Sequence, residues 1–419
     1  MDQQTIKDIP QRILENKKVL VRVDFNVPTD KKNNKVTITN DLRIKSSIPT
    51  IKYLIESKAK IALVSHLGRP KGFDNELKMD PIAERLSQLL GSKVLKLNDC
   101  IGPEVQKSID NLKAGEVCLL ENVRFYREEE KNDTEFARNL AKPFEIYVND
   151  AFGTSHRAHA STAGVTAFLS PSLAGLLLQK EVDSLNKVLT NPIRPFTTVL
   201  GGSKISSKIE VIKQLIPKVD TLLIGGAMAF TFIKAKGGEI GNSLFEEKFI
   251  PLIKEIDKLK EEYAVALILP EDMVCIRESE DQRIRGSENQ KSGVSIYPID
   301  KIPQGYTGLD IGPKSVEKFT KLISQSKTIF WNGPMGMFED AQFMEGTKKV
   351  AEALVEATKK KSITVVGGGD SVTAIENLKI SFNNFTHVST GGGASIEFIE
   401  GKTLPGIACL DRKITTSKA

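Results

Sequence analysis

The sequence predicts an α/β protein made of two doubly wound, Rossmann-like domains with parallel sheets, joined by a helix hinge. Short apolar segments alternate with amphipathic helical segments nearly throughout, which is the pattern of a parallel sheet covered on both faces. The chain has 419 residues, more than the roughly 250–300 at which a single core stops growing. Its 40% hydrophobic and 27% charged residues are ordinary for globular proteins, so global disorder is not expected.

The first half of the chain contains the first set of expected strands, at 19–23, 61–64, 94–97, 117–120 and 146–148. A Lys/Asn-rich loop follows the first strand, and Asn40 or Asp41 can then cap a helix that ends near residue 57. Asp80 and Pro81 start a second helix in the favoured order of cap followed by proline.

The proline-punctuated stretch 191–195 is the expected domain connection, and a helix at 181–189 precedes it. Beyond this stretch the alternation resumes. The second set of strands is expected at 197–200, 221–224, 264–269, 328–331 and 363–366. Helices are expected at 206–216, 246–263, 313–324 and 346–358.

Charge and composition favour small anionic ligands. The net charge of +6 is mildly basic, and only 6% of the residues are aromatic, so platforms for stacking nucleic-acid bases are scarce. The 4 cysteines lie far apart without a CxxC pair, which indicates reduced thiols in a cytoplasmic protein.

A membrane or an address signal is not expected. No charged segment followed by an apolar one opens the chain, as a secretory signal would require. The stretch 158–179 has no Lys, Arg, Asp or Glu, but its Ser, Thr and Pro residues make it too polar and broken for a spanning helix. We expect it to form buried core and loop. The ending 417–419 loosely resembles a peroxisomal address, but Ala replaces Leu, and a frayed polar terminus explains it better.

Polar and cationic side chains follow the strands of the first half, at the sheet edge where open α/β sheets bind ligands. These residues are Asp24, Asn26, Ser65, His66, Arg69, Arg124, His156 and Arg157. Arg43 lies in the first turn of a capped helix, where a cation opposes the helix dipole, so a bound anion would explain it. Each arginine alone could be a solvated or structural charge, and His66 could be a hydrogen-bonded structural histidine. Together the arginines suit phosphate or carboxylate.

Glycine-rich turns follow the strands of the second half instead, at 200–208, 224–230, 331–339 and 365–370. Such turns let a polyphosphate lie against bare backbone. Lys204 and Lys208 are one helical turn apart and could both project toward the same anion, or they could form a solvated helix face.

The segment 363–374 predicts a strand, a glycine turn and a helix that together cradle a phosphate. Asp370 would repel the phosphate unless a cation lies between them, which suggests Mg²⁺. The alternative is a packing turn that needs its glycines and uses Asp370 as an N-cap.

Several longer motifs resemble one family in the right order, whereas GxxxxGK[ST], GxGxxG with a downstream acid, and HRD are absent. The motifs are VLVRVDFNVP, SHLGRP, LLENVRFYREEE, DAFGTSHRAHAS, LGGSKISSKI, LLIGGAMAFTF, GLDIGP, WNGPMGMFE, VVGGGDS and STGGGAS. They resemble phosphoglycerate kinase over essentially the whole chain.

The resemblance implies a glycolytic, cytoplasmic, monomeric enzyme that passes a phosphoryl group reversibly between 1,3-bisphosphoglycerate and ADP, giving 3-phosphoglycerate and MgATP. It implies a phosphoglycerate-binding domain at 1–185, with 400–419 packing back on it, and a nucleotide-binding domain at 186–399. Hinge bending would close the domains before transfer.

The same resemblance assigns roles to residues of this sequence. The acid substrate would be held by Asp24, Asn26, Arg43, Ser65, His66, Arg69, Arg124, His156 and Arg157. The nucleotide would be held by Gly202, Lys204, Lys208, Gly225, Gly226, Gly308, Leu309, Asn332, Pro334, Glu339, Gly368, Gly369, Asp370 and Ser371. Asp370 would hold the metal. Ser371 stands where many relatives have Thr, and Ala227 where some have Gly.

Catalysis on this reading needs no general base, because the acceptor is a carboxylate that is already ionised. Arg43, Lys204 and the backbone of Gly369, with Mg²⁺, would neutralise charge on the migrating phosphoryl group. Two other classes of function remain open: a non-catalytic nucleotide-binding scaffold on the same fold, and a basic nucleic-acid binder. Dispersed charges argue against the second.

Overall fold

The computed structural model describes residues 1–32, 35–277 and 293–413. The chain divides into two compact units, the first of Met1–Asp183 with Lys402–Ala419 and the second of Ser184–Gly401. The chain passes from one unit to the other inside a single helix, α5 (Leu176–Thr190). The expectation that 191–195 connects the domains was therefore wrong, because α5 contains no proline and continues across the boundary, so the proline-rich stretch belongs to the second unit.

The first unit is built on a six-stranded parallel sheet. In spatial order its strands are β5 (Val94–Lys96), β6 (Val117–Leu119), β4 (Lys60–Val64), β1 (Lys18–Arg22), β7 (Ile146–Asn149) and β8 (Ser172–Ala174). β1 pairs with β4 on one side and with β7 on the other, so the strand order reverses beside β1. At such a reversal the connections leave in opposite directions and open a crevice at the carboxyl ends of the strands.

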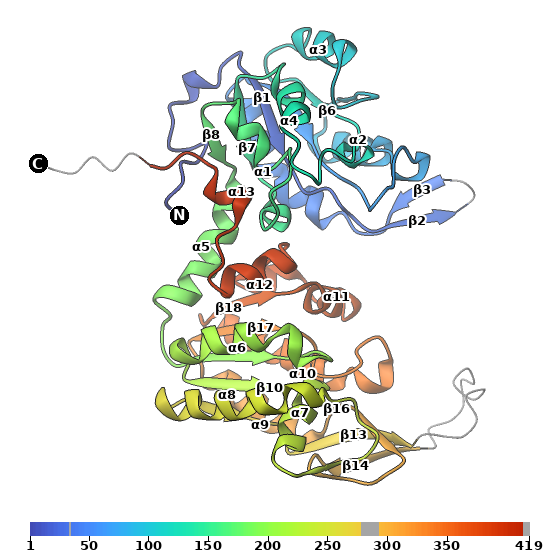
Figure 1. The fold of residues 1–419 in the computed structure, drawn as a ribbon, viewed down its shortest axis with the longest axis vertical. Coiled ribbons are helices and arrows are strands. Elements are labelled where there is room, and N and C mark those ends of the chain that lie inside the picture. Colours follow the sequence, from blue (N-terminus) through green and yellow to red (C-terminus); the bar gives the residue numbers. More distant parts are fainter. Residues whose placement is uncertain (33–34, 278–292, 414–419) are drawn as a thin grey trace, which may run out of the picture. The chain divides into compact units, whose positions relative to one another are not determined.

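Helices cover the faces of this sheet (Figure 1). They are α1 (Leu42–Glu56), α2 (Asp80–Leu90), α3 (Pro103–Asp110) and α4 (Thr134–Ala141). The side chain of Asn40 accepts the Leu42 N–H at 2.8 Å at the start of α1. Asp80 is the first helical residue of α2 rather than its cap, because the cap position is occupied by Met79.

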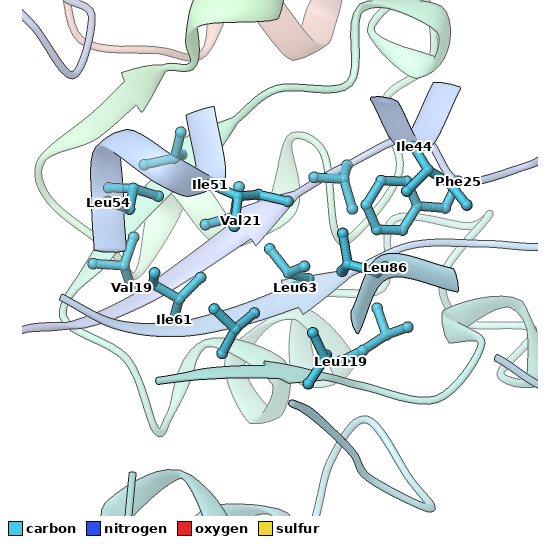
Figure 2. Close-up of a cluster of buried hydrophobic side chains, with 14 of the residues drawn as sticks. Val19, Val21, Phe25, Ile44, Ile51, Leu54, Ile61, Leu63, Leu86 and Leu119 are labelled. Atoms are coloured by element: carbon cyan, nitrogen blue, oxygen red, sulfur yellow. The ribbon is translucent and has the colours of Figure 1, made fainter. Parts of the chain in front are cut away.

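The core of the first unit packs α1 and α2 onto β1, β4 and β6 (Figure 2). Val19 and Val21 of β1 lie beside Ile61 and Leu63 of β4, all completely buried, and Ile51 of α1 packs over them. Burying one such side chain contributes roughly 1.5–3 kcal/mol, so this cluster holds the sheet edge that carries the polar residues in place.

The Lys/Asn-rich segment expected as a loop contains a two-stranded antiparallel hairpin, β2 (Thr29–Lys32) and β3 (Lys35–Ile38). The hairpin projects from the body of the first unit (Figure 1). Charged side chains alternate there with few apolar ones, so the sequence had no buried strand face to reveal it.

The second unit has its own six-stranded parallel sheet, whose order again reverses beside the first strand of the unit. In spatial order the strands are β12 (Ala266–Ile268), β10 (Thr221–Ile224), β9 (Phe196–Leu200), β17 (Thr328–Asn332), β18 (Ile363–Gly367) and β19 (His387–Val388).

The second unit has a helix close to each expected position, with two shortened at their starts, and two further helices, over 228–235 and 393–399, that were not expected. The helices of this unit are α6 (Ile209–Leu215), α7 (Met228–Ala235), α8 (Ile250–Glu262), α9 (Pro313–Gln325), α10 (Glu345–Lys359), α11 (Gly369–Asn377) and α12 (Gly393–Ile399). The helix expected from residue 206 begins at Ile209 because the preceding turn, η6 (Ile205–Ser207), is a tighter 3₁₀ helix. The helix expected from 246 likewise begins at Ile250.

Sequence reasoning missed an antiparallel sheet in the second unit. Its order is β14 (Val294–Pro298), β13 (Asp272–Arg277) and β16 (Tyr306–Ile311), and a smaller sheet pairs β11 (Glu239–Ile240) with β15 (Lys301–Ile302). β14 alternates exposed and half-buried residues, so its apolar residues do not form a continuous run.

The chain returns to the first unit through α13 (Pro405–Ala408). The Asn149 side-chain amide donates to the Gly406 carbonyl at 2.6 Å, and the Asp411 N–H donates to the Ser172 carbonyl at 2.9 Å. Residues 417–419 lie outside the described part of the chain. Across the described residues, none of the helices combines the length and apolar character that membrane crossing needs.

Candidate active site

The strand ends of the first unit bring together most of the polar residues that the sequence singled out. Asp24 and Asn26 follow β1, and Ser65 follows the neighbouring β4. The Ser65 hydroxyl accepts the Phe25 N–H at 2.9 Å, and the Asn26 side chain accepts the Gly68 N–H at 2.8 Å. These backbone contacts lock the two strand-end loops against each other.

Arg43 has a different partner from the one that the sequence suggested. Its guanidinium donates to the Asp24 carboxylate at 2.6 Å, and the Arg43 side chain is 31% exposed. Asp24 therefore balances the cation that opposes the α1 dipole, while the exposed part of the guanidinium can still meet an anion.

Arg124 lies in the 3₁₀ turn η3 (Val123–Phe125) after β6. It donates to the Gly68 carbonyl at 2.9 Å and pairs with Glu130 at 3.1 Å. Burial lowers its pKa and the charge of Glu130 opposes this shift, whereas the charges of Arg22 and Arg157 add to it, so the three guanidinium groups contribute to one positive field. Such a field favours a multiply charged anion.

His156 and Arg157 lie on the loop after β7, where the Arg157 Nε donates to the His156 Nε2 at 3.1 Å. Arg157 is exposed, as is Arg69 at the other loop. Both guanidinium groups are therefore available to solvent and to ligands.

Arg22, which was not among the predicted site residues, lies in β1 and is completely buried. Its Nη2 is 3.1 Å from the His66 Nδ1. Burial lowers the pKa of His66 well below its usual value, and Arg22, Arg124, Arg43 and His159 act in the same direction. The sequence feature that could have identified Arg22 is a charged residue that ends an otherwise apolar strand segment, 19–22.

In the second unit, glycine turns from three adjacent strands interlock through their backbones. The Gly202 N–H donates to the Pro334 carbonyl at 2.9 Å, and the Gly226 N–H donates to the Met335 carbonyl at 3.0 Å. Gly226 has φ +67°, and a Cβ there would lie 2.6 Å from the Gly202 carbonyl oxygen. Only glycine permits this approach, so the turns form a rigid backbone surface.

The fourth turn joins β18 to α11 in the form expected of a phosphate cradle. Gly368, with φ +87°, is the N-cap residue, and because it has no side chain, no side-chain hydrogen bond caps the helix start. The alternative in which Asp370 caps the helix is therefore wrong, because Asp370 lies inside the first turn and is exposed. A Cβ at Gly369 would meet nothing within 4 Å, so the helix start is open. The Ser371 hydroxyl instead accepts the Gly333 N–H at 2.6 Å.

Lys204 and Lys208 do not share a helix face, because the turn between them is 3₁₀ and α6 begins after Lys208. Lys204 is exposed, whereas Lys208 is buried and donates to the Asn332 side-chain oxygen. Burial lowers the pKa of Lys208 to about 8, although the carboxylates of Asp370 and Glu400 oppose this shift. The Asn332 Nδ2 is buried with no partner within the described residues.

The remaining candidates lie on β16 and on the turn after β17. Gly308 faces Phe230, since a Cβ there would lie 2.5 Å from the ring, and the Leu309 carbonyl accepts the Met337 N–H at 2.8 Å. Gly225 also lies in the interlocked turns, whereas Glu339 is exposed. The Phe230 ring therefore lies directly beside β16 at Gly308.

Among the described residues, no cluster of three or more His, Cys, Asp or Glu side chains could enclose an ion. Asp370 offers one exposed carboxylate at the open helix start. This fits Mg²⁺, which is usually held by one or two carboxylates together with substrate phosphates.

Comparisons with known proteins point to one family. The family model for phosphoglycerate kinase matches residues 6–402. The phosphoglycerate kinase of Dictyoglomus turgidum is 53% identical over 413 residues, covering 99% of this chain and 100% of that protein. The chloroplastic phosphoglycerate kinase of Volvox carteri is 49% identical, covering 98% of this chain and 86% of that protein.

A solved structure agrees with these sequence relatives. The structure of phosphoglycerate kinase from Coxiella burnetii matches with a TM-score of 0.83 at 39% identity, covering 97% of this chain and 98% of that one. Because the family model, the sequence relatives and this structure all extend over nearly the whole chain, the protein belongs to the phosphoglycerate kinase family.

Proposed function

We propose that this protein transfers a phosphoryl group reversibly between 1,3-bisphosphoglycerate and ADP, giving 3-phosphoglycerate and ATP in glycolysis and gluconeogenesis. The protein is a phosphotransferase of this family. The observation that supports the proposal most strongly is the pairing of two chemistries on one chain: an arginine-rich strand edge in the first unit and interlocked glycine turns in the second.

The first unit binds the phosphoglycerate in this proposal. Arginine forks suit its phosphate and carboxylate, and the neutral side chains of the strand-end loops suit its hydroxyl. The residues proposed for these contacts are Asp24, Asn26, Arg43, Ser65, His66, Arg69, Arg124, His156 and Arg157. Support comes from the shared positive field of Arg124, Arg22 and Arg157.

The second unit binds the nucleotide. The phosphates of the nucleotide lie against the backbone of Gly202, Gly368 and Gly369, with Lys204, Lys208, Asn332 and Ser371 nearby. Its adenosine lies among Gly225, Gly226, Gly308, Leu309 and Pro334, with Glu339 on the ribose. Asp370 contributes a ligand to the Mg²⁺ that accompanies the nucleotide, and this ion neutralises phosphate charge during transfer.

Catalysis in this proposal consists of positioning and charge neutralisation. The acceptor carboxylate needs no base, so the cations of Arg43 and Lys204 and the N–H of Gly369 are aimed at the charge on the migrating group. Direct transfer requires the two bound substrates to meet, so we propose that the two units close by hinge bending when both are bound.

We further propose that the protein is a cytoplasmic monomer. The four cysteines are all free, as expected for a reducing compartment. Sedimentation at working enzyme concentration tests the monomer, since a mass of twice 46.1 kDa would contradict it.

A coupled assay tests the activity itself. ATP consumption that depends on both 3-phosphoglycerate and Mg²⁺ is the expected result. A protein that binds nucleotide but shows no consumption would instead be a scaffold on this fold. Tight, salt-dependent DNA or RNA binding without turnover would favour the nucleic-acid alternative.

A further inference from the structure

A buried arginine lies behind the strand-end loops of the first unit. Arg22 is completely buried in β1, where an unpaired charge would be strongly unfavourable. Its Nε donates to the Ser161 hydroxyl at 2.8 Å, its Nη1 donates to the Val23 carbonyl, and its Nη2 lies 3.1 Å from the His66 Nδ1. Each of its three nitrogens therefore has a defined partner.

The negative charge that balances Arg22 belongs to Glu129, which is also completely buried. The Ser161 hydroxyl donates to one Glu129 oxygen at 2.6 Å, and the Ser161 N–H donates to the other at 2.8 Å. Both oxygens thus act as acceptors, as they do in an ionised carboxylate. Burial raises the Glu129 pKa, whereas Arg22 and Ser161 lower it.

The Ser161 hydroxyl has one proton, so its use toward Glu129 leaves its lone pairs to accept from Arg22. The hydrogen bonds thus run in one direction, from Arg22 through Ser161 to Glu129. Glu129 also lies 3.8 Å from the His159 Nδ1. Burial lowers the His159 pKa to about 4, so His159 is neutral near pH 7 and adds no competing cation.

The contact with Arg22 determines the state of the His66 ring. A guanidinium can only donate, so the His66 Nδ1 facing Arg22 must accept and carries no proton. The ring is then neutral, with its single proton on Nε2. The charged and titratable groups that act on His66 come from several elements, namely Arg22 of β1, Arg124 of η3, Arg43 of α1 and the loop residue His159.

We propose that Glu129, Ser161 and Arg22 are positioning residues that hold His66 as the neutral Nε2–H tautomer, so that His66 meets the anionic substrate only as a neutral donor. This inference rests on the proposed phosphoglycerate site and deepens it. Positive charge in that site then comes from arginines alone, and His66 adds no pH-dependent affinity near neutrality.

Nitrogen NMR of the full-length protein labelled at histidine tests the tautomer directly. The chain has 4 histidines, so the ring signals can be assigned by single substitutions. We expect His66 to show an unprotonated Nδ1 and a protonated Nε2, with no titration between about pH 5.5 and 8. A protonated Nδ1, or a cationic ring in this range, would overturn the proposal without any variant.

Variants test whether the three positioning residues cause this state. Arg22→Met removes the donor, and Ser161→Ala removes its link to Glu129 while keeping both charges. In either variant we expect the His66 pKa to rise above its wild-type value, because the guanidinium that faces Nδ1 is removed or loses its anchor, whereas the burial that lowers this pKa remains. Arg12→Met, at an exposed arginine of the same unit, should leave the His66 signals unchanged. An unaltered His66 in both variants would contradict the positioning role.

Binding of 3-phosphoglycerate gives a second readout. The ratio of variant to wild-type Kd should fall by up to about fivefold from pH 8 to 5.5, the scale of exchanging a neutral donor for a charged one. Because the ligand phosphate titrates in the same way with both proteins, its effect on affinity cancels in the ratio of the two Kd values. If His66 has the expected tautomer but 3-phosphoglycerate does not perturb its signals, the proposed site is wrong while the positioning role stands.

Discussion

Arg43 and Lys204 are the two cations whose roles depend most on single side chains. Arg43 is held by Asp24 at 2.6 Å but stays partly exposed, and Lys204 is exposed at the start of η6. Neither charge is needed to fill a core, so each can be removed with little effect on packing. Their substitution therefore reports on catalysis rather than on folding.

Arg43→Ala and Lys204→Ala are each expected to lower kcat by at least about 100-fold, the scale for losing one transition-state charge donor. Steady-state assays with both substrates saturating measure this effect. Arg12→Ala and Lys254→Ala, at exposed positions of the respective units, serve as controls. Near-normal turnover in either test variant would refute the role of that residue.

Asp370 has an exposed carboxylate at the start of α11 and is the proposed metal ligand. Asp370→Asn should weaken MgADP binding by about tenfold or more, because the amide keeps one oxygen but loses the charge that attracts Mg²⁺. Affinity for 3-phosphoglycerate should change little. Calorimetric titrations with each ligand test this, and the reverse pattern would remove Asp370 from the metal site.

Asp310 is a buried carboxylate whose pKa is raised to about 7 by burial, although the Gly346 and Ile311 N–H groups oppose the shift. A folded-state pKa above the unfolded value means that its stabilising effect is complete below about pH 4 and is lost as pH rises toward 7. The free energy of unfolding of the second unit should therefore decrease over this window by a few kcal/mol, on the order of the shift.

Asp310→Asn should flatten this pH dependence. Fluorescence of the single tryptophan, Trp331, reports unfolding of the same unit, so urea titrations at several pH values give the comparison. The exposed Asp300 provides the matched control Asp300→Asn. If the free energy of unfolding falls equally with pH in the wild-type and Asp310→Asn proteins, another group causes the pH dependence.

At the scale of elements, the turn η6 between Lys204 and Lys208 is held by a carboxylate from a distant segment, Glu246. The Glu246 carboxylate accepts the Ser206 N–H and the Ser206 hydroxyl, both at 2.8 Å. Lys204 contributes to the lowered pKa of Glu246, after the two Ser206 hydrogen bonds, which act against burial. This carboxylate clamp therefore orders η6 and places a counter-charge near Lys204.

Glu246→Gln should raise the KM for ATP by about three- to tenfold, with a smaller change in kcat, because the amide replaces one of the two accepting oxygens with an NH2 donor. The adjacent exposed residue gives a matched control, Glu247→Gln, which should behave as wild type. Equal kinetics for the two variants would show that η6 is ordered without the clamp.

At the scale of the whole molecule, the two compact units are joined through α5, and the C-terminal residues return to the first unit. Each unit has its own sheet and its own candidate site. A direct transfer between ligands bound to separate units makes closure a requirement of the proposed reaction.

Small-angle scattering should show a radius of gyration that decreases by about 1 Å or more when 3-phosphoglycerate and a nonreactive MgATP analogue are both bound. Either ligand alone should cause a smaller change. An unchanged radius with both sites saturated would contradict the closure proposal.

The sequence by itself determined the α/β class, most strand positions and the chemistry of the two sheet edges. Apolar runs and glycine turns are local signals, because a buried strand must be apolar and a positive φ favours glycine. The glycines at 202, 226 and 368 were recognisable for this reason, and their φ values are all positive.

Tertiary structure alone decided which groups become partners. Arg22 meets Ser161 at a separation of 139 residues, and Lys208 meets Asn332 at a separation of 124. The antiparallel sheet of β13, β14 and β16 and the passage through α5 also depend on packing between distant segments. Periodicity and propensity are properties of neighbours along the chain, whereas burial and hydrogen-bond partnership arise only when the folded chain brings distant residues together.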